Sequence, residues 1–237
     1  MRALVIVPAW NEERDLPAVL AELRRVAPEW DVCVVDDGSS DRTAAVAREG
    51  GARVLRLPMN LGIGGAVQTG YLWARERGYQ IAAQIDGDGQ HDPQYLEAAL
   101  GPIRAGTADL VIGSRYIGAG GFRSTALRRT GARYLSWFLR LRCGARVTDP
   151  TSGFRVAGPR AIELFAASYP SDYPEPEAIA LAARGGLRVE EFPVVMRERR
   201  HGSSSIGPVR TVYYLIKVSL ALLLLPAERR HKPEIAG

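Results

Sequence analysis

Short apolar segments rich in β-branched residues alternate with segments of helical periodicity through the first half of the chain. The five predicted strands are "ALVIVPA", "DVCVVDD", "ARVLRL", "YQIAAQID" and "ADLVIGS". The helical segments between them are Leu16–Val26, Asp41–Glu49, Ile63–Arg77 and Pro93–Ala105. Strands that alternate with helices predict an α/β fold, in which helices cover both faces of a mostly parallel sheet.

The pattern changes after Arg115. A glycine-rich connection leads to an arginine-rich helical stretch over residues 124–142, and the loop "VTDPTSGFR" precedes a helix that begins at Pro159. The segment "SDYPEPEAIALAARGG" and a strand within "LRVEEFPVVM" follow. Neither repeats nor a low-complexity linker interrupt this half, so we expect it to join the first half in one domain.

Four of the predicted strands end in polar or small residues. The clusters are "PAWNEE", "DDGSSD", "DGDGQHD" and "GSR". Ligands of open α/β sheets bind beyond the carboxyl ends of the strands, which share one edge. The four clusters therefore predict a single site at that edge.

The apolar tail "VRTVYYLIKVSLALLLLP" predicts a C-terminal helix. Such a helix would be about 27 Å long, slightly short of a hydrocarbon core of roughly 30 Å, and Arg210 and Lys217 interrupt it. We therefore expect it to lie in a membrane interface, to pack on its own domain, or to form a homodimer contact. Its apolar stripe is Val212, Leu215, Ile216, Leu220 and Leu223.

Composition adds few constraints on function. The net charge is +5, but no run of five basic residues occurs, which disfavours a nucleic-acid partner. Cys33 and Cys143 lack the spacing of a disulfide framework or a metal site, and Cys33 lies inside a predicted strand as a buried thiol. The N-terminus does not resemble a signal peptide, so we expect a cytoplasmic protein.

The stretch "IDGDGQHDP" carries the most specific chemistry. Asp86 and Asp88 flank a glycine at the end of a predicted strand, and Gln90 follows. Carboxylate and amide oxygens are hard donors that suit Mg²⁺ or Mn²⁺. They supply only part of an octahedral shell, so phosphate oxygens and water would complete it. Asp92, which precedes a proline, is better explained as the start of a helix.

The glycine-rich stretch "NLGIGGAVQTGY" leaves two interpretations open. It does not fit the dinucleotide-binding pattern, because Val67 stands where the third glycine should be and the motif follows the third strand. The glycines either pack a helix tightly against the sheet or let the backbone approach a nucleotide. In the second case Asn60 would supply a polar contact.

Seven motifs together resemble one enzyme family. In chain order they are "VPAWNEE", "VVDDGSSDRT", "NLGIGGAVQTGY", "DGDGQHDP", "GSR", "DPTSGFR" and "RERRHGSSSI". This order resembles family 2 glycosyltransferases, and in particular the branch that transfers mannose or glucose to dolichyl or polyprenyl phosphate. The resemblance covers roughly residues 3–206. It implies a GT-A fold, an inverting reaction and a nucleoside-diphosphate-sugar donor.

The resemblance also implies roles for individual residues. Those that would border the nucleotide are Pro8, Ala9, Asn11 and Glu12. Asp37 would lie close to the base or ribose. Asp86, Asp88 and Gln90 would hold the cation under the diphosphate, which makes Asp88 part of the catalytic centre.

Three arginines match positions where this branch gathers positive charge around the donor and acceptor phosphates. They are Arg115, Arg129 and Arg199. Guanidinium groups bind such phosphates bidentately and stay charged. For Arg128, Arg133 and Arg197, a solvated helix charge is an equally good interpretation.

The resemblance predicts a division of the chain. A single GT-A domain would span residues 1–207. Residues 1–115 would bind the nucleotide sugar and residues 116–207 would face the acceptor. Residues 208–237 would form the C-terminal helix and a basic tail, which could bind the inner face of the cell membrane peripherally.

The acceptor decides what the acidic residues near the C-terminal half do. A hydroxyl of a glycan or small molecule needs a carboxylate that takes its proton, and Glu175, Glu177 and Asp149 are the candidates. A polyprenyl phosphate is already anionic and needs no base. Two other functions, a sugar nucleotidyltransferase and a non-catalytic nucleotide-sugar-binding protein, fit less well. The first strand is followed by the acidic stretch "NEERD" rather than a basic glycine-rich loop, and the metal motif is intact.

Overall fold

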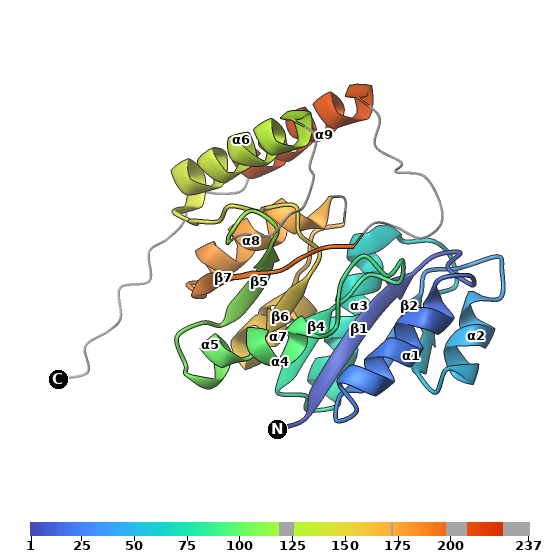
Figure 1. Cartoon of the computed structure of the whole chain (residues 1–237). Helices are drawn as coiled ribbons and strands as arrows, with labels where there is room; N and C mark the ends of the chain where they lie inside the picture. The colour runs from blue at the N-terminus through green and yellow to red at the C-terminus, as the bar shows by residue number, and fades with distance from the viewer. Residues whose placement is uncertain (119–125, 172, 198–207, 225–237) are drawn as a thin grey trace.

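A seven-stranded sheet forms the centre of the computed structural model, which describes residues 1–118, 126–171, 173–197 and 208–224 (Figure 1). The strand order is β3-β2-β1-β4-β6-β5-β7. The strands are β1 (Ala3–Ala9), β2 (Asp31–Asp36), β3 (Arg53–Arg56), β4 (Ile81–Gln84), β5 (Leu110–Ser114), β6 (Arg155–Ala157) and β7 (Val189–Pro193). Only β6 runs antiparallel to its neighbours. The predicted mostly parallel sheet is therefore confirmed.

The helices largely match the predicted segments. They are α1 (Leu16–Val26), α2 (Thr43–Glu49), α3 (Gly62–Glu76), α4 (Tyr95–Ala99), α5 (Gly101–Arg104), α6 (Ala126–Cys143), α7 (Pro159–Ala167), α8 (Pro174–Arg184) and α9 (Pro208–Leu224). The prediction of one helix over Pro93–Ala105 was wrong, because the chain forms α4 and α5 instead. Pro102 has no backbone N–H to continue the first helix, and it suits the first turn of a new one.

Strand β6 was not predicted. It has only three residues, too few for periodicity to be seen, and it follows a loop rich in turn residues. It nevertheless bridges β4 and β5, so strands from both predicted halves of the chain belong to one sheet.

Helices bury both faces of the sheet. Along β1, Leu4 and Ile6 pack toward α3 and α7, whereas Val5 and Val7 pack toward α1. All four side chains are buried, as expected for a central parallel strand. Cys33 on β2 is also buried, and burial raises the pKa of its thiol to about 12.

The glycines of α3 allow close packing. A Cβ atom at Gly64 would lie 2.1 Å from the carbonyl oxygen of Pro170, and one at Gly70 would lie 2.3 Å from Cγ2 of Ile6. Close packing of the helix against the sheet is thus confirmed at Gly70, whereas Gly64 gives room to the loop after α7.

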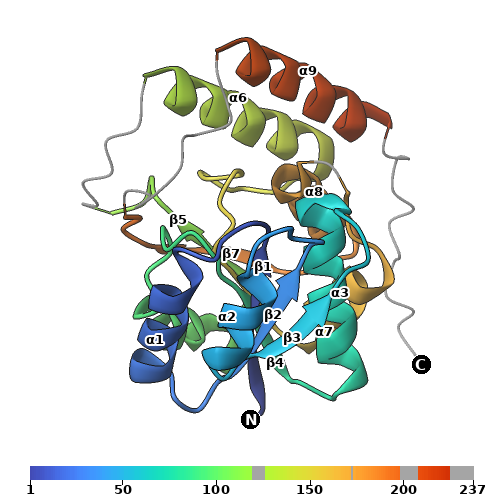
Figure 2. The ribbon, with the colours of Figure 1, turned by 90° about the vertical axis from the view of Figure 1, so that its right-hand side faces the viewer.

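Helices α6 and α9 lie side by side in an outer layer beyond the end of the sheet (Figures 1 and 2). They run in the same direction, since Tyr134 contacts Ser219 and Arg142 contacts the carbonyl oxygen of Leu223. The α9 side chains of Val218 and Leu222 are buried. This helix is therefore packed on its own domain, which was one of the open alternatives. In the part of the chain that the structure describes, no helix combines the length and apolarity needed to cross a membrane.

Candidate active site

A pocket of about 620 Å³ lies where the strand order reverses, beyond the carboxyl ends of β1 and β4. The chain leaves β1 toward β2 and β3 on one side, and β4 stands on the other. In open α/β sheets this reversal opens the crevice in which ligands bind. The predicted site residues that line the pocket are Pro8, Ala9, Glu12, Asp37, Asp86, Asp88 and Glu175. The expectation that the strand ends form one site is confirmed for the loops after β1, β2 and β4.

Asp86 is supported from two sides. Its backbone N–H donates to Nδ1 of His91 over 3.0 Å, and His91 Nε2 lies 3.7 Å from the Asp86 carboxylate. On the other side, a Cβ atom at Gly153 would lie 3.1 Å and 3.2 Å from the two carboxylate oxygens. Glycine at this position therefore leaves the space that the carboxylate occupies. The side chain of Asp86 remains 36% exposed, so a ligand can reach it.

Asp88 lines the same pocket but is almost buried, at 4% exposed. One of its oxygens accepts the backbone N–H of Gln90 at 3.0 Å. The Gln90 side chain turns toward the carbonyl oxygen of Arg197, 3.5 Å from its amide nitrogen, and it does not line the pocket. The structure thus brings the two aspartates together and leaves Gln90 beside them, so its metal role stays a prediction.

Asp37 connects the pocket to α3. Its two carboxylate oxygens accept the backbone N–H groups of Leu61 and Gly62 at 2.7 and 2.9 Å, which caps the start of the helix. Each oxygen retains a further lone pair, and the residue lines the pocket. A contact with a base or ribose remains compatible with this cap.

The loop after β1 is tied to the loop after β2. Asn11 adopts a left-handed backbone conformation with φ of 56°. Its N–H donates to Ser39, and its side-chain oxygen accepts the Ser40 N–H. The next residue, Glu12, lines the pocket and donates its N–H to Thr43. Asn11 therefore holds the shape of the pocket wall without lining it.

The structure distinguishes the two glutamates of α8. Glu175 lines the pocket, whereas Glu177 does not. Burial raises the pKa of the Glu175 carboxyl above its usual range. The neighbouring charge of Asp86 adds to this effect, while Arg155 and Arg115 oppose it. If the reaction needs a base, Glu175 is the better placed of the two.

Arg115 is held by Asp149. Its Nε and Nη2 donate to the two oxygens of this buried carboxylate at 2.6 and 2.7 Å, and Nη2 also donates to Thr151 at 2.8 Å. Burial acts to lower the pKa of Arg115, but the hydrogen bonds and charge of Asp149 outweigh it and leave the pKa raised. This fork occupies Asp149, which makes it a poor candidate for a base.

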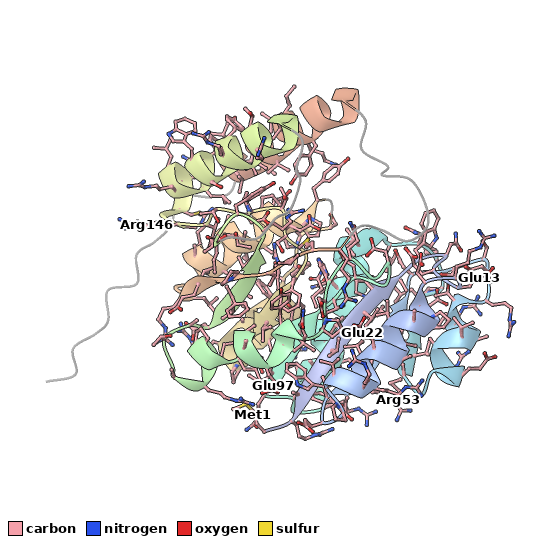
Figure 3. All side chains as sticks on the ribbon, in the orientation of Figure 1. Met1, Glu13, Glu22, Arg53, Glu97 and Arg146 are labelled. Carbon is pink, nitrogen blue, oxygen red and sulfur yellow. The ribbon has the colours of Figure 1, made fainter. Side chains whose placement is uncertain are left out.

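Of the other two arginines predicted to bind phosphate, the structure describes one. Arg129 is an exposed residue of α6, and Arg199 lies outside the described residues. Arg197 forms a fork with Glu22, labelled in Figure 3, at 2.6 and 2.9 Å, and contacts Asp92 at 2.5 Å. Arg197 lies outside the helices and is held by two carboxylates, so its interpretation as a solvated helix charge was wrong. The gathering of arginines around phosphates stays a prediction.

Two residues at the pocket, Trp10 and His91, were not predicted from the sequence. Trp10 lines the pocket with 56% of its surface exposed, directly after β1. His91 supports Asp86 as described above and packs edge-on against Phe154, with ring centres 5.8 Å apart. Both residues lie inside motifs that had been noticed, but only the fold shows which way they face.

Comparison with known proteins agrees with this geometry. Residues 4–163 match the profile of Glycosyl transferase family 2. The chain belongs to this family. It is 36% identical to the undecaprenyl-phosphate mannosyltransferase of Micrococcus luteus, with 87% of this chain and 88% of that protein aligned. It is 33% identical to the polyprenol monophosphomannose synthase of Mycolicibacterium smegmatis, over 87% and 81% of the two chains.

The fold is shared with solved glycosyltransferases. One is glucosyl-3-phosphoglycerate synthase from Mycobacterium tuberculosis, crystallised with Mn²⁺ and UDP-glucose. It superposes with a TM-score of 0.70 at 24% identity, over 94% of this chain and 78% of that one. The predicted GT-A fold is thereby confirmed, and this family 2 member is a glycosyltransferase.

The cap that Asp37 places on α3 predicts a loss of stability when it is removed. Asp37→Ala leaves the Leu61 N–H without its acceptor and the Gly62 N–H with the Asn60 side-chain oxygen alone, and it should lower the free energy of unfolding by about 1–2 kcal/mol. Urea denaturation measures this, with Glu29→Ala at an exposed site as the control. A stability equal to that of the control would show that the carboxylate serves a ligand alone.

Proposed function

We propose that this glycosyltransferase moves a sugar from a nucleoside diphosphate onto polyprenyl phosphate, with inversion at the anomeric carbon. The observation that carries this proposal is the pair Asp86 and Asp88, which line a pocket at the reversal of the strand order. The names of the relatives in Micrococcus luteus and Mycolicibacterium smegmatis support a polyprenyl-phosphate acceptor.

Asp86 and Asp88 fit a divalent cation, Mg²⁺ or Mn²⁺. Both are oxygen donors, Asp86 is accessible, and Gly153 leaves its carboxylate room. Within the described ranges, however, no three acidic, histidine or cysteine side chains converge into a metal site of their own. We therefore assign the remaining ligands to the donor diphosphate and water. A cation bound there would offset the charge of the departing diphosphate.

The order of residues along the sheet edge suggests how the donor lies. Asp37 and Asn60 follow β2 and β3, and they would meet the base and ribose at that end. Trp10 offers an exposed ring at the same wall. Asp86 follows β4 on the other side of β1, where the diphosphate would lie. The sugar would then extend toward Glu175.

An acceptor phosphate explains the chemistry without a base. One of its oxygens would form the new bond to the anomeric carbon as the bond to the diphosphate breaks, and the electron pair would leave with the nucleoside diphosphate. The nucleophile already carries its charge, so no proton has to be removed. A second candidate, transfer to a hydroxyl, is favoured by one observation: burial raises the pKa of Glu175, as a general base requires.

The outer layer of α6 and α9 fits a membrane that contains such an acceptor. Large apolar side chains on this layer are exposed: Tyr134, Trp137, Leu141, Ile216, Leu220, Leu223 and Leu224. Exposed arginines accompany them on α6: Arg129, Arg133, Arg140 and Arg142. Together they form the α6–α9 face, whose apolar groups and positive charge suit an anionic lipid surface. We propose that the enzyme works on the cytoplasmic side of the membrane through this face.

The acceptor is tested by following radiolabelled sugar into the organic phase. Uridine- and guanosine-diphosphate sugars are each incubated with polyprenyl phosphate and Mn²⁺, and we expect labelled lipid from at least one. With that donor at saturation, Glu175→Gln should retain a kcat within about tenfold of the wild type, because no base is needed. Glu177→Gln is the matched control on the same helix. Label that appears only on water-soluble acceptors, with a collapse of kcat in Glu175→Gln, would establish the hydroxyl acceptor instead.

The role of the aspartate pair predicts a loss of metal-dependent binding. Asp86→Asn and Asp88→Asn each remove one negative charge with little change of shape, and we expect Mn²⁺ to stop strengthening the binding of a nucleoside diphosphate. Asp92→Asn is the control, because this residue lies in the same loop but pairs with Arg197 and does not line the pocket. Calorimetric titration with UDP or GDP, with and without Mn²⁺, measures the effect. An unchanged Mn²⁺ effect in both pocket variants would refute the metal role.

The α6–α9 face predicts membrane binding that charge can abolish. Trp137→Glu combined with Leu220→Glu should weaken binding to vesicles of anionic phospholipid by about tenfold or more, because each change removes an apolar side chain from the contact. Met59→Glu alters an equally exposed apolar residue outside this face and should bind as the wild type does. Co-sedimentation with vesicles provides the measurement. Equal sedimentation of all three proteins would contradict the proposed orientation.

A further inference from the structure

Arg155 is an arginine with no exposed surface, and it lies on β6 next to the pocket-lining segment of α8. A buried guanidinium is costly unless its donors and its charge are matched. Its Nε donates to the carbonyl oxygen of Ser152 at 3.2 Å, and its Nη2 donates to the carbonyl oxygen of Glu175 at 2.5 Å. Its third nitrogen, Nη1, has no hydrogen-bond partner among the described residues.

The surroundings of Arg155 are polar as well as buried. Gln84 stands opposite it in the register of β4 and β6, and the Gln84 side-chain oxygen lacks a partner within the described part of the chain. The hydroxyl of Tyr71, on α3, is in the same situation. Arg155 acts on the pKa of Tyr71 and on that of Tyr169, whose ring lies 5.7 Å from that of Tyr71. A core built only for stability would not place so many polar groups together.

Arg155 reaches the pocket through Glu175. Its Nη2 donates to the Glu175 carbonyl oxygen and so fixes the backbone of a residue that lines the candidate active site. Burial raises the pKa of the Glu175 carboxyl, and the positive charge of Arg155 opposes this shift.

The chain enters α8 through a constrained residue. Tyr173 has a left-handed backbone with φ of 51°, which a non-glycine residue adopts only when its surroundings enforce it. The ring of Tyr214 on α9 packs against the Tyr173 ring at 4.8 Å, and Lys217 lies 5.5 Å from it. Two residues later, Arg155 binds the Glu175 carbonyl. The first turn of α8 is thus fixed from both the sheet and α9.

Glu175 occupies a defined place in the site. The charges of Asp86 and Arg115 both act on its carboxyl, so it lies within electrostatic reach of the proposed diphosphate site and of the end of β5. In the proposed arrangement of the donor, that place belongs to the sugar. Its carboxyl oxygens can accept hydrogen bonds from sugar hydroxyl groups.

We infer that Arg155 is a positioning residue: through its hydrogen bond to the Glu175 carbonyl oxygen it fixes the first turn of α8, so that the Glu175 side chain binds the sugar of the donor. The inference rests on the proposed function, because it takes the pocket to be the donor site. It assigns Glu175 a role in recognising the sugar, whether or not this residue also acts as a general base.

The test compares a nucleotide sugar with its free diphosphate. UDP-glucose and UDP, and GDP-mannose and GDP, are titrated with Mn²⁺ into the wild type and into Arg155→Met, Glu175→Gln and the double variant. Arg155→Met should weaken the binding of the nucleotide sugar by about tenfold or more and change the binding of the free diphosphate little, because only the contact with the sugar is lost. Glu175→Gln should show the same selective loss. The double variant should lose no more than either single variant, since both act through one carboxylate.

Controls separate positioning from folding and from failure of the proposed function. Arg155→Met leaves the carbonyl oxygens of Ser152 and Glu175 without their donor, so its thermal melting is measured first to establish that it folds. If Arg155→Met does not melt cooperatively, Arg155→Lys takes its place. Lysine keeps the positive charge but cannot donate to both carbonyl oxygens as arginine does, so this variant should lose part of the preference for the nucleotide sugar over the free diphosphate. Arg188→Met removes an arginine that pairs with Asp109 and should bind both ligands normally.

Two results would overturn the role of Arg155. One is an equal loss for sugar nucleotide and free diphosphate, which a purely structural residue would produce. The other is a double variant whose fold-loss in affinity for the nucleotide sugar equals the product of the fold-losses of the two single variants, as independent residues would give. A wild-type protein that binds neither nucleotide sugar would instead refute the proposed function, before any variant is compared.

Discussion

The repulsion between Asp86 and Asp88 is the constraint on which the site depends. Two carboxylates separated by one residue at the end of a buried strand are unfavourable unless positive charge or hydrogen-bond donors compensate. The backbone N–H of Gln90 donates to Asp88, and the charge of Arg115 acts on Asp86 although its guanidinium is paired with Asp149. In the proposed function a divalent cation adds positive charge beside both carboxylates.

Much of the fold could be predicted from the sequence because its signals are local. The five parallel strands of the first half and the boundaries of α1 follow from periodicity and from apolar runs. The short strand β6 could not be predicted in this way, since three residues carry no period and their pairing with β4 and β5 is set by the tertiary structure. The division of α4 and α5 follows from Pro102, whose effect was overlooked within a longer helical pattern.

The part of the site that lies in short acidic motifs at the strand ends could be predicted from the sequence. Asp86, Asp88 and Asp37 line the pocket as expected, because the carboxyl ends of parallel strands meet. Side-chain direction was not predictable: Gln90 turns toward Arg197, Arg115 turns toward Asp149, and Glu175 rather than Glu177 enters the pocket. The C-terminal helix shows the same limit. Of its predicted apolar stripe, Leu215 packs against the core, Ile216, Leu220 and Leu223 are exposed, and the side chain of Val212 lies outside the described residues. The buried Val218 and Leu222 were not in the predicted stripe.

Helix α9 also joins parts of the molecule that the sequence suggested were separate. One side of it contributes to the α6–α9 face, and Tyr214 on the other side packs against Tyr173 at the entry to α8. The proposed contact with a lipid surface and the entry to α8, which carries Glu175, thus involve the same helix. Deleting the tail would disturb both, so substitutions on its exposed side are the better means of separating them.

We propose that the aspartate pair forms half of a metal site and that the donor diphosphate completes it. Titration of Mn²⁺, followed by its electron paramagnetic resonance signal, tests this most directly when done with and without UDP or GDP. We expect Mn²⁺ to bind the protein alone weakly and to bind at least about tenfold more tightly when the diphosphate is present. By linkage, Mn²⁺ should raise the affinity of the protein for the diphosphate by the same factor. Equal Mn²⁺ affinity in the presence and absence of either diphosphate would contradict the account.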